Sequence, residues 1–238
     1  GFQPRGGGKR QAPAFDVIAP GVAKHEEEIV LAPGAEPAAD PNLVLRVAVA
    51  AAEYGLPIAP GTLRNLKKCP IGDRNWTDES RELFIRLLAS GPALLNVWED
   101  IDFIDVPGKL IPEWLGVRNR PSASAAHRYT IDRHMVEVVT RLGRETPSGG
   151  RYDDRHYEAL LLAGILHDIG KRPGVANHAA EGARHATVVV ERMGFDRDIV
   201  RWVTLLVRVH LTLPDFATGR NPNDPNVGDD LAGRLDHN

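Results

Sequence analysis

The chain has 238 residues and a formal net charge of -3, with 29 Lys and Arg against 32 Asp and Glu. This balance lacks the strong positive charge that is typical of proteins whose main partner is nucleic acid. No apolar run approaches the roughly 20 residues that span a membrane, and with Cys69 as the only cysteine an intramolecular disulfide is excluded. We therefore expect a soluble, cytoplasmic protein without a membrane or nucleic-acid partner.

Residues 1–39 predict a connector with a possible short β-hairpin. Residues 1–14 are rich in Gly and Pro and show no apolar periodicity. Residues 15–18 and 28–31 could form two short strands joined by a turn near Pro20 and Gly21. The acidic run at residues 26–28 favours a solvated connector instead, and both interpretations stay open.

Residues 40–121 predict an all-helical subdomain. Asp40 and Pro41 supply an N-cap and a first-turn proline for a helix that ends at Gly55. Further helical segments are expected where apolar residues recur at helical spacing: residues 62–68, 77–91, 92–101 and 110–115. Trp98 and Trp114 in these segments are most simply residues of the core.

Residues 122–238 predict a second helical bundle. A helix over residues 130–144 carries His134 beside its apolar stripe. Helices over residues 178–193 and 195–210 follow, with His178 on a face of the first and His210 on the inward stripe of the second. A last helix is expected near residues 228–235.

Residues 160–171 are the most informative stretch of this bundle. They are apolar or Gly through Leu166, which indicates a helix buried on most sides. His167 and Asp168 stand at its end, and we interpret Gly170 as the helix stop. Because burying an unpaired carboxylate is costly, and because a metal ion satisfies an imidazole and a carboxylate together, the pair indicates a metal site.

Such a site needs ligands from other helices, because adjacent helical side chains diverge by about 100°. The inward-facing candidates on or next to four helices are His134, His167, Asp168, His178 and His210. Nitrogen and oxygen ligands without thiolates suit Mn, Mg, Fe or Zn. A divalent metal held in this way can activate water and polarise a phosphoryl oxygen, which is the chemistry of phosphoester hydrolysis.

Three cations could meet a substrate phosphate. Lys171 follows the His-Asp pair directly, where it is equally explained as a cation at a helix C-terminus. Arg118 and Arg120 lie in a polar joint that is also explained as an exposed turn. For all three cations, the sequence leaves both phosphate binding and the simpler structural explanation open.

Several motifs resemble known enzymes. Residues 164–171, with the sequence Gly-Ile-Leu-His-Asp-Ile-Gly-Lys, resemble the HD superfamily of metal-dependent phosphohydrolases. Residues 127–134, 192–195 and 213–215 are more closely similar to the family of bifunctional PII uridylyltransferase/uridylyl-removing enzymes in its actinobacterial form. Segments at residues 56–60 and 110–114 resemble that family's helical region between its two catalytic domains, so the likeness covers most of the chain from about residue 40.

The resemblance implies that residues 122–238 are an HD domain that removes UMP from the uridylylated PII protein. The N-terminal nucleotidyltransferase and C-terminal ACT domains of the family are not in these residues. The implied metal ligands are His134, His167, Asp168, His178, His210 and, at the position of a terminal ligand, Asn221. The implied catalytic residues are Asp168, which positions the attacking water, and Lys171. The implied substrate-binding residues are Arg118, Arg120, His127 and Lys171.

The chain departs from the family pattern at three positions. Asn177 stands where Asp is usual, Val209 where His is usual and Asn221 where Asp is usual. These departures motivate an alternative in which the helices form a non-catalytic regulatory or docking module. A hydrolase of the same superfamily that acts on free nucleotides is a further alternative.

Overall fold

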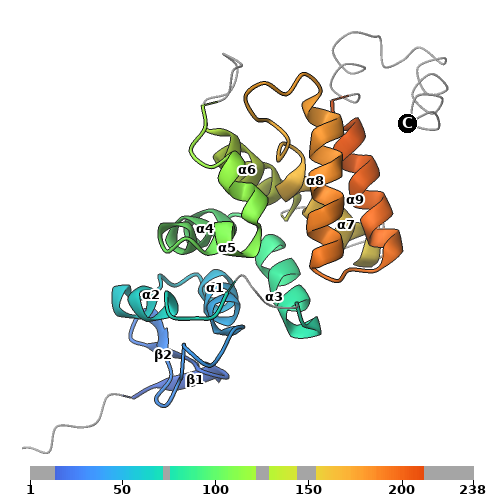
Figure 1. Cartoon of the computed structure of the whole chain (residues 1–238). Coiled ribbons are helices and arrows are strands. Elements are labelled where there is room, and N and C mark those ends of the chain that lie inside the picture. The colour runs from blue at the N-terminus through green and yellow to red at the C-terminus, as the bar shows by residue number, and fades with distance from the viewer. Residues whose placement is uncertain (1–13, 72–75, 122–128, 144–153, 212–238) are drawn as a thin grey trace, which may run out of the picture.

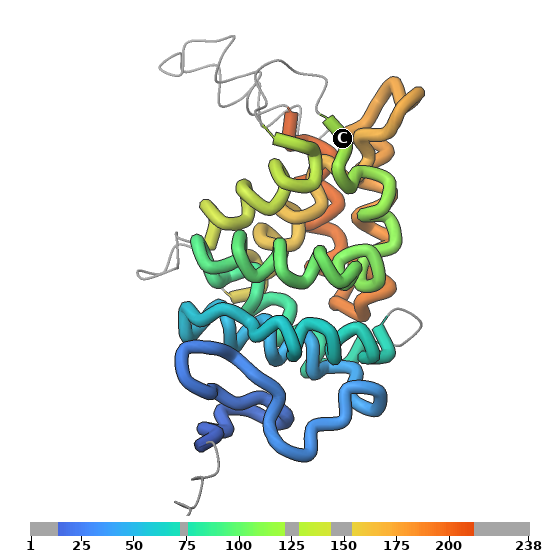
Figure 2. The backbone as a smooth tube through the Cα atoms, turned by 90° about the vertical axis from the view of Figure 1, so that its left-hand side faces the viewer, coloured from blue at the N-terminus to red at the C-terminus, as the bar shows by residue number. Residues whose placement is uncertain are grey.

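The computed structural model describes residues 14–71, 76–121, 129–143 and 154–211. The protein is mostly helical with a small antiparallel sheet near the N-terminus, which confirms the predicted fold class (Figure 1). From the sheet at one end, the chain passes through stacked helices to the C-terminal helices at the other end (Figure 2). None of the helices in the described residues has both the length and the apolar character needed to cross a membrane.

The sheet consists of β1 (Asp16–Ala19), β2 (Val22–His25) and β3 (Glu28–Leu31), in the order β1-β2-β3. The predicted short hairpin near the N-terminus is confirmed, with strands at both predicted positions, and the structure adds a third strand, β2, which lies between them and pairs with both. Two tight turns make room for it: Gly21 adopts a φ of 74° after β1, and Glu26 adopts a φ of 52° after β2. Of the acidic run, Glu26 and Glu27 therefore form the second turn and Glu28 begins β3, so the run is part of the sheet and not a separate connector.

The first helices, α1 (Leu43–Tyr54) and α2 (Pro60–Leu66), lie next to this sheet. As predicted, α1 ends at Gly55, which adopts the left-handed conformation with a φ of 64°. The predicted N-cap was wrong by two residues, since Asn42 precedes the helix. Asp40 is used differently: its carboxylate accepts a hydrogen bond from Asn42 N and pairs with Arg46.

The rest of the N-terminal half is helical as predicted and consists of α3 (Asp78–Leu88), α4 (Ala93–Phe103), α5 (Val106–Leu110) and the 3-10 helix η1 (Pro112–Gly116). A capping box between Thr77 and Ser80 begins α3. Trp98 and Trp114 are 4% and 1% exposed, which confirms them as core residues. Their ring centroids lie 5.3 Å apart.

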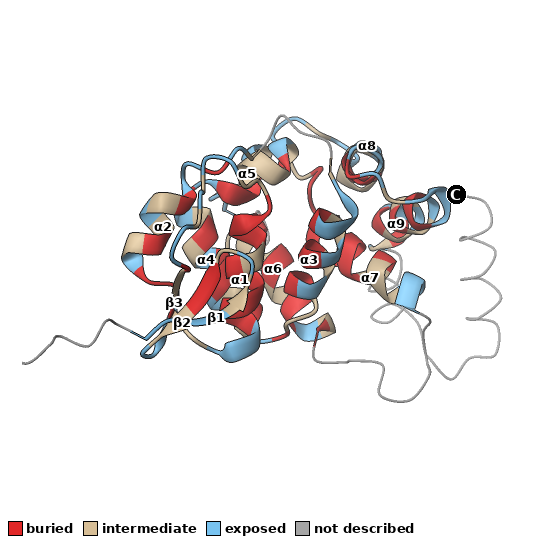
Figure 3. Cartoon of the chain, turned by 90° about the horizontal axis from the view of Figure 1, so that it is seen from below, coloured by how far each residue is buried: buried red, intermediate tan, exposed pale blue. Residues whose placement is uncertain are grey.

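Four helices form the C-terminal half of the described chain: α6 (Ile131–Leu142), α7 (Asp154–Leu166), α8 (His178–Arg192) and α9 (Arg197–Val209). The helix α9 packs against both α7 and α8, and α6 packs against α7. Their buried faces turn toward one another (Figure 3). The predicted helix at 228–235 lies outside the described residues, and the predicted domain boundaries at residues 39 and 121 stay predictions.

The C-terminal end of α7 differs from its prediction. The helix ends at Leu166, and Gly170 is not its left-handed stop. Instead, a Cβ atom on Gly170 would overlap Gly182 N and His178 O. The absence of a side chain at Gly170 therefore lets the first turns of α8 pack directly against the turn that follows α7.

Candidate metal centre

The four C-terminal helices bring five predicted ligands together. His134 lies on α6, His167 and Asp168 follow α7, His178 begins α8 and His210 follows α9. They form two groups, His134 with His167 and Asp168, and Asp168 with His178 and His210. Within each group the potential ligand atoms lie within 4.8 Å of one another. Asp168 belongs to both groups and is the centre of the cluster.

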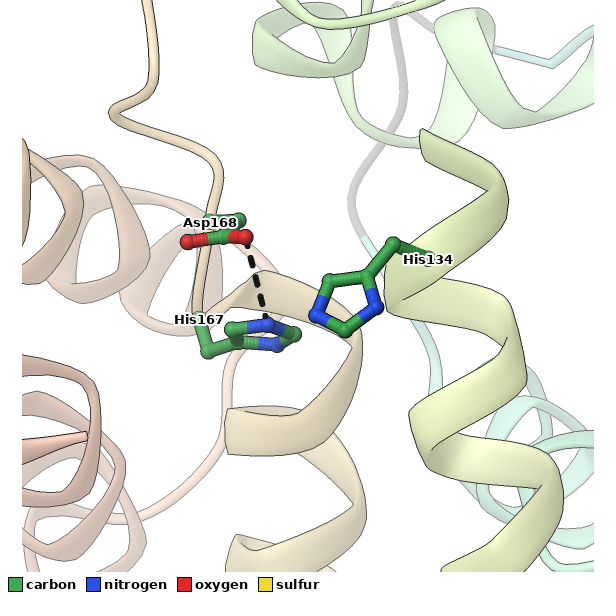
Figure 4. Close-up of side chains that lie close together, drawn as sticks. All are labelled: His134, His167 and Asp168. Carbon is green, nitrogen blue, oxygen red and sulfur yellow. Dashed lines mark ion pairs between the residues drawn. The ribbon is translucent and has the colours of Figure 1, made fainter. Parts of the chain in front are cut away.

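Asp168 is 1% exposed and has cations or imidazoles on both carboxylate oxygens. Its Oδ2 accepts a hydrogen bond of 2.7 Å from Lys171 Nζ and lies 3.4 Å from His167 Nε2, while His134 faces the pair from α6 (Figure 4). Its Oδ1 lies 3.4 Å from His210 Nε2. Burial alone would raise the pKa of Asp168, but the contacts with His167, His210 and Lys171 outweigh it and hold the pKa well below its usual range.

Two of the imidazole rings are oriented by backbone carbonyls of their own helices. His167 Nδ1 lies 2.8 Å from Gly164 O, and His210 Nδ1 lies 2.6 Å from Val207 O. A carbonyl oxygen can only accept, so each Nδ1 carries the hydrogen and donates it. In the neutral form of each ring the lone pair is therefore on Nε2, and both Nε2 atoms face Asp168. Metal-binding histidines commonly donate the hydrogen of their other ring nitrogen to a backbone carbonyl in this way, which fixes the orientation of the ring.

His178 completes the second group from the N-terminus of α8. The helix begins there because the Asn177 side chain accepts a hydrogen bond of 3.0 Å from Ala180 N. Burial, together with the nearby charge of Lys171, lowers the pKa of His178. The ring is therefore neutral near pH 7 and keeps a lone pair that a metal can use.

The cluster fits a divalent metal. Three of its buried atoms have no hydrogen-bond partner among the residues that the structure describes: Asp168 Oδ1, His178 Nε2 and His210 Nε2. Atoms bound to one ion at about 2.0–2.2 Å lie roughly 3–3.5 Å from each other, and the 3.4 Å between Asp168 Oδ1 and His210 Nε2 falls in this range. A cation among these atoms would satisfy all three together.

A cavity of about 570 Å³ opens beside the cluster and has an apolar wall. The wall is formed by Val138, Leu142, Leu160, Ala163, Leu206 and Leu211. None of these residues was predicted from the sequence as part of the site. The available signal was their helical spacing from the ligands, because Val138 lies four residues after His134 and Ala163 and Leu206 lie four residues before His167 and His210.

The other predicted site residues lie apart from the cluster or outside the described residues. Arg118 pairs with Asp102 at 3.1 Å and with Asp105 at 2.7 Å, so its charge is engaged next to α4. Neither Arg118 nor Arg120 lines the cavity beside the metal centre. His127 and Asn221 lie outside the described residues. Substrate binding by Arg118, Arg120 and His127 stays a prediction, as does metal binding by Asn221.

The fold and the cluster together define a mostly helical protein with a candidate centre for a divalent metal. No family model matches the chain. The chain is 40% identical over 206 residues to the bifunctional uridylyltransferase/uridylyl-removing enzyme of Mycobacterium tuberculosis, covering 86% of this chain and 25% of that enzyme. It is 39% identical over 224 residues to the enzyme of the same name from Streptomyces coelicolor, covering 93% and 26%.

A third relative of the same name, from Corynebacterium glutamicum, is 31% identical over 195 residues, which are 81% of this chain and 27% of the relative. Most of the chain is therefore homologous to one segment of the bifunctional uridylyltransferase/uridylyl-removing enzymes, and the predicted resemblance is confirmed. The chain spans about a quarter of the length of these relatives. Which of their two named activities this segment carries is a separate question.

Proposed function

We propose that this chain carries the uridylyl-removing activity, as an HD-type, metal-dependent hydrolase that releases UMP from the uridylylated PII protein. One observation carries the proposal: Asp168 Oδ1, His178 Nε2 and His210 Nε2 converge without hydrogen-bond partners in the described part of the chain. The names of the relatives supply the reaction, since they include a uridylyl-removing function.

The five clustered side chains have distinct roles in this proposal. A divalent metal, Mn, Mg, Fe or Zn, would supply a Lewis acid that activates water and polarises the phosphoryl group. His134, His167, Asp168, His178 and His210 would hold it. Asp168 is ionised, so a carboxylate oxygen is available to accept a hydrogen bond from the attacking water and to orient it.

Lys171 adds a positive charge at the same place. Its Nζ lies 2.7 Å from Asp168 Oδ2, and its side chain is 25% exposed toward the cavity that both residues line. An ammonium group in this position can interact with a phosphate oxygen as negative charge develops there. Lys171 is therefore the cation that we assign to the substrate phosphate.

The apolar wall of the 570 Å³ cavity can bind a ring of the substrate. Leu142, Leu160 and Leu206 contribute to a wall beside the charged end formed by Asp168 and Lys171. In a uridylyl-tyrosine the phosphodiester joins the tyrosine ring on one side to a ribose that carries the uracil ring on the other, and one of these rings can pack against such a wall. The phosphodiester then lies at the charged end of the cavity.

Two of the three positions that depart from the family pattern have roles in the fold outside the cluster. Asn177 caps α8 through its side chain, and Val209 is 5% exposed in the packed bundle. The five clustered ligands do not include either residue. The five side chains of the cluster therefore converge without an aspartate at 177 or a histidine at 209.

The test is release of UMP from uridylylated PII in the presence of Mn or Mg. The wild-type chain is compared with His167→Ala and Asp168→Ala, and His185→Ala is the matched control because this histidine pairs with Glu181 outside the cluster. We expect release by the wild type and by His185→Ala only. Equal release of UMP by all four proteins would contradict the proposal.

Two further measurements separate the alternatives. Elemental analysis should find a stoichiometric divalent metal in the wild type and less in Asp168→Ala. A wild-type protein that holds no metal and releases no UMP would support the non-catalytic docking module instead. Cleavage of free nucleotides in preference to uridylylated PII would support the nucleotide hydrolase.

A further inference from the structure

The 570 Å³ cavity beside the metal centre is a groove with a charged end and an apolar end. The charged end contains the imidazole of His167, the carboxylate of Asp168 and the ammonium of Lys171. The apolar end extends along α6 to Leu142 and along α7 to Leu160. Because Leu160 lies seven residues before His167, a rise of 1.5 Å per residue makes this part of the groove about 10 Å long.

The apolar side chains of this groove are accessible, unlike those of the core. Leu142, Leu160 and Leu206 are partly exposed, and Leu211, which follows α9, is 38% exposed. The helices α6 and α9 both pack against α7, so α7 forms the floor of the groove between them. A Cβ atom at Gly164 on this floor would lie 2.8 Å from Leu142 Cδ1, so the glycine leaves Leu142 its place in the wall.

The wall offers no hydrogen-bonding side chain among the described residues. Its side chains are all aliphatic: Val138, Leu142, Leu160, Ala163, Leu206 and Leu211. Backbone N–H and C=O groups inside α6, α7 and α9 are bonded within their helices. The carbonyl of Gly164 also accepts a hydrogen bond from His167 Nδ1. In the described part of the chain, the polar groups of the groove therefore lie at its charged end.

The two sides of a uridylyl-tyrosine differ in how they fit such a wall. A uracil ring carries two carbonyl oxygens and an N–H, and its ribose carries hydroxyl groups, all of which would lose their hydrogen bonds to water there. An esterified tyrosine ring has one polar atom, the ester oxygen, and this atom is bonded to the phosphorus at the charged end. The tyrosine ring therefore leaves no polar group unpaired against the wall.

We infer that the groove binds the aromatic ring of the substrate tyrosine and that the uridine lies outside it. The inference rests on the proposed function, which supplies the uridylyl-tyrosine. Leu142, Leu160 and Leu206 are then specificity-determining residues, because they contact the ring. The chemical class that the groove accepts is a phenol substituted in the para position, with its oxygen toward Asp168 and Lys171.

The experiment titrates the 238-residue chain, without added metal, with 4-methylphenol and with uridine. The first probe is the side chain of tyrosine, and the second is the other neutral half of the substrate. The readout is the set of leucine methyl signals in the NMR spectrum of the carbon-13-labelled protein. We expect saturable shifts of the Leu142, Leu160 and Leu206 signals with 4-methylphenol and none with uridine.

A pair of neighbouring leucines on α9 tests the assigned contact. Leu206→Ala removes most of one side chain from the wall, so it should weaken binding of 4-methylphenol about fivefold. The matched control is Leu205→Ala, because Leu205 is 40% exposed and does not line the groove. This control should bind 4-methylphenol with unchanged affinity.

Three results would overturn the inference. These are no saturable shift with 4-methylphenol, binding of uridine in the groove with equal or higher affinity, or the same affinity for 4-methylphenol in Leu206→Ala and the wild type. If Leu206→Ala fails to fold, Leu211→Ala replaces it, because this residue lines the groove but is 38% exposed. It should also weaken binding, and unchanged affinity would again overturn the inference.

A failure of this inference is distinguishable from a failure of the proposed function, because binding is measured without metal and without turnover. Release of UMP from uridylylated PII, together with binding of uridine in place of 4-methylphenol, would overturn the inference alone. Binding of 4-methylphenol without release of UMP would contradict the proposed function and support the groove as a site for phenols.

Discussion

Two buried carboxylates, Asp168 and Asp132, use similar chemistry in different surroundings. Each has one oxygen without a hydrogen-bond partner in the described residues. Around Asp168, the neighbours are imidazole rings and the Lys171 ammonium, whereas the printed hydrogen-bond partner of Asp132 is one backbone N–H. The neighbours, and not the carboxylate, therefore decide whether a buried carboxylate suits a metal.

The surroundings of the two carboxylates also differ in how they are assembled. The metal centre needs α6, α7, α8 and α9 to meet at one point, with backbone contact between the turn after α7 and the start of α8. Asp132 lines a separate cavity of about 260 Å³, which needs only the pairing of the first turn of α6 with α4 and η1. A substitution that displaces one of the helices α7, α8 or α9 should therefore weaken metal binding and leave the cavity at Asp132 unchanged.

The largest effect is expected from Asp168→Ala. This change removes the ligand that both groups share, so the affinity for Mn should fall about a hundredfold or more. Asp132→Ala, which removes the other buried carboxylate, should leave the affinity for Mn unchanged. Titration calorimetry of the three proteins with Mn measures the difference, and equal losses in both variants would remove the distinction between the two sites.

Gly170→Ala tests the dependence of the metal centre on close helix packing. The added Cβ would overlap Gly182 N and His178 O, so the free energy of unfolding should fall by about 1–3 kcal/mol. Affinity for Mn should fall as well, because α8 carries His178. Urea denaturation and Mn titration measure the two effects.

The matched control for that substitution is Gly61→Ala in α2. A Cβ at Gly61 would lie 3.7 Å from Arg64 Nη2, which is an ordinary contact. Because alanine is the better helix former, the control should gain up to about 1 kcal/mol of stability. Equal destabilisation by both substitutions would show that the packing at Gly170 has no special role.

Lys171→Met tests whether the positive charge beside Asp168 can come from a bound metal in place of the Lys171 ammonium. Without metal, the variant leaves Asp168 Oδ2 without the ammonium at 2.7 Å, so unfolding should cost about 1–2 kcal/mol less than in the wild type. Saturating Mn should reduce this difference, because the metal supplies the missing positive charge. Lys24→Met, which removes an exposed pair with Asp16, should change stability little in either condition.

The smallest effect is expected for the ion pair that joins the two regions. Glu113 on η1, beside Trp114, accepts hydrogen bonds from Arg192 at the end of α8. Burial tends to raise the pKa of Glu113, but the hydrogen bonds from Arg192 outweigh it and lower the pKa. The pair therefore stabilises the fold above the ordinary value of 4.5, and this contribution is lost as the pH falls through the lowered pKa.

Glu113→Gln should consequently lower stability at pH 7 by about 0.5–1 kcal/mol, since the Arg192 side chain is 37% exposed and solvent screens the pair. The difference from the wild type should shrink as the pH falls below 4.5 and vanish once the pH is below the lowered pKa of Glu113. Urea denaturation at several pH values measures it. A difference that does not depend on pH would assign the effect to packing instead of charge.

The sequence predicted the helices well because their apolar spacing and their end signals agree. Gly55 ends α1, Thr77 begins α3, and His134, His167, Asp168, His178 and His210 come from elements that were predicted within a few residues. The strand β2 was not predicted, although it is as long as β1 and β3, because it directly follows the turn signal at Pro20 and Gly21 and ends in the polar residues Lys24 and His25. The N-cap of α1 was predicted at Asp40 because aspartate is a common capping residue. In the structure the Asp40 carboxylate pairs with Arg46 instead.

Other features could not follow from sequence because they depend on contacts between distant segments. The close approach of Gly170 and Gly182 joins two helices, and a glycine signals a stop or a close contact equally well. The orphaned groups of Asp132 and Trp114 are visible only once α6 and η1 lie side by side. A buried polar group without a partner is a property of the assembled structure.

The bonds from His167 Nδ1 to Gly164 O and from His210 Nδ1 to Val207 O have a thermodynamic consequence. Each ring is fixed by a carbonyl three residues earlier in its own helix, so its rotamer is set when the helix forms. Immobilising a free side chain on binding costs about 0.5–1.5 kcal/mol in entropy. For these two histidines that entropy is lost during folding, so an arriving ion would bind to rings that are already ordered.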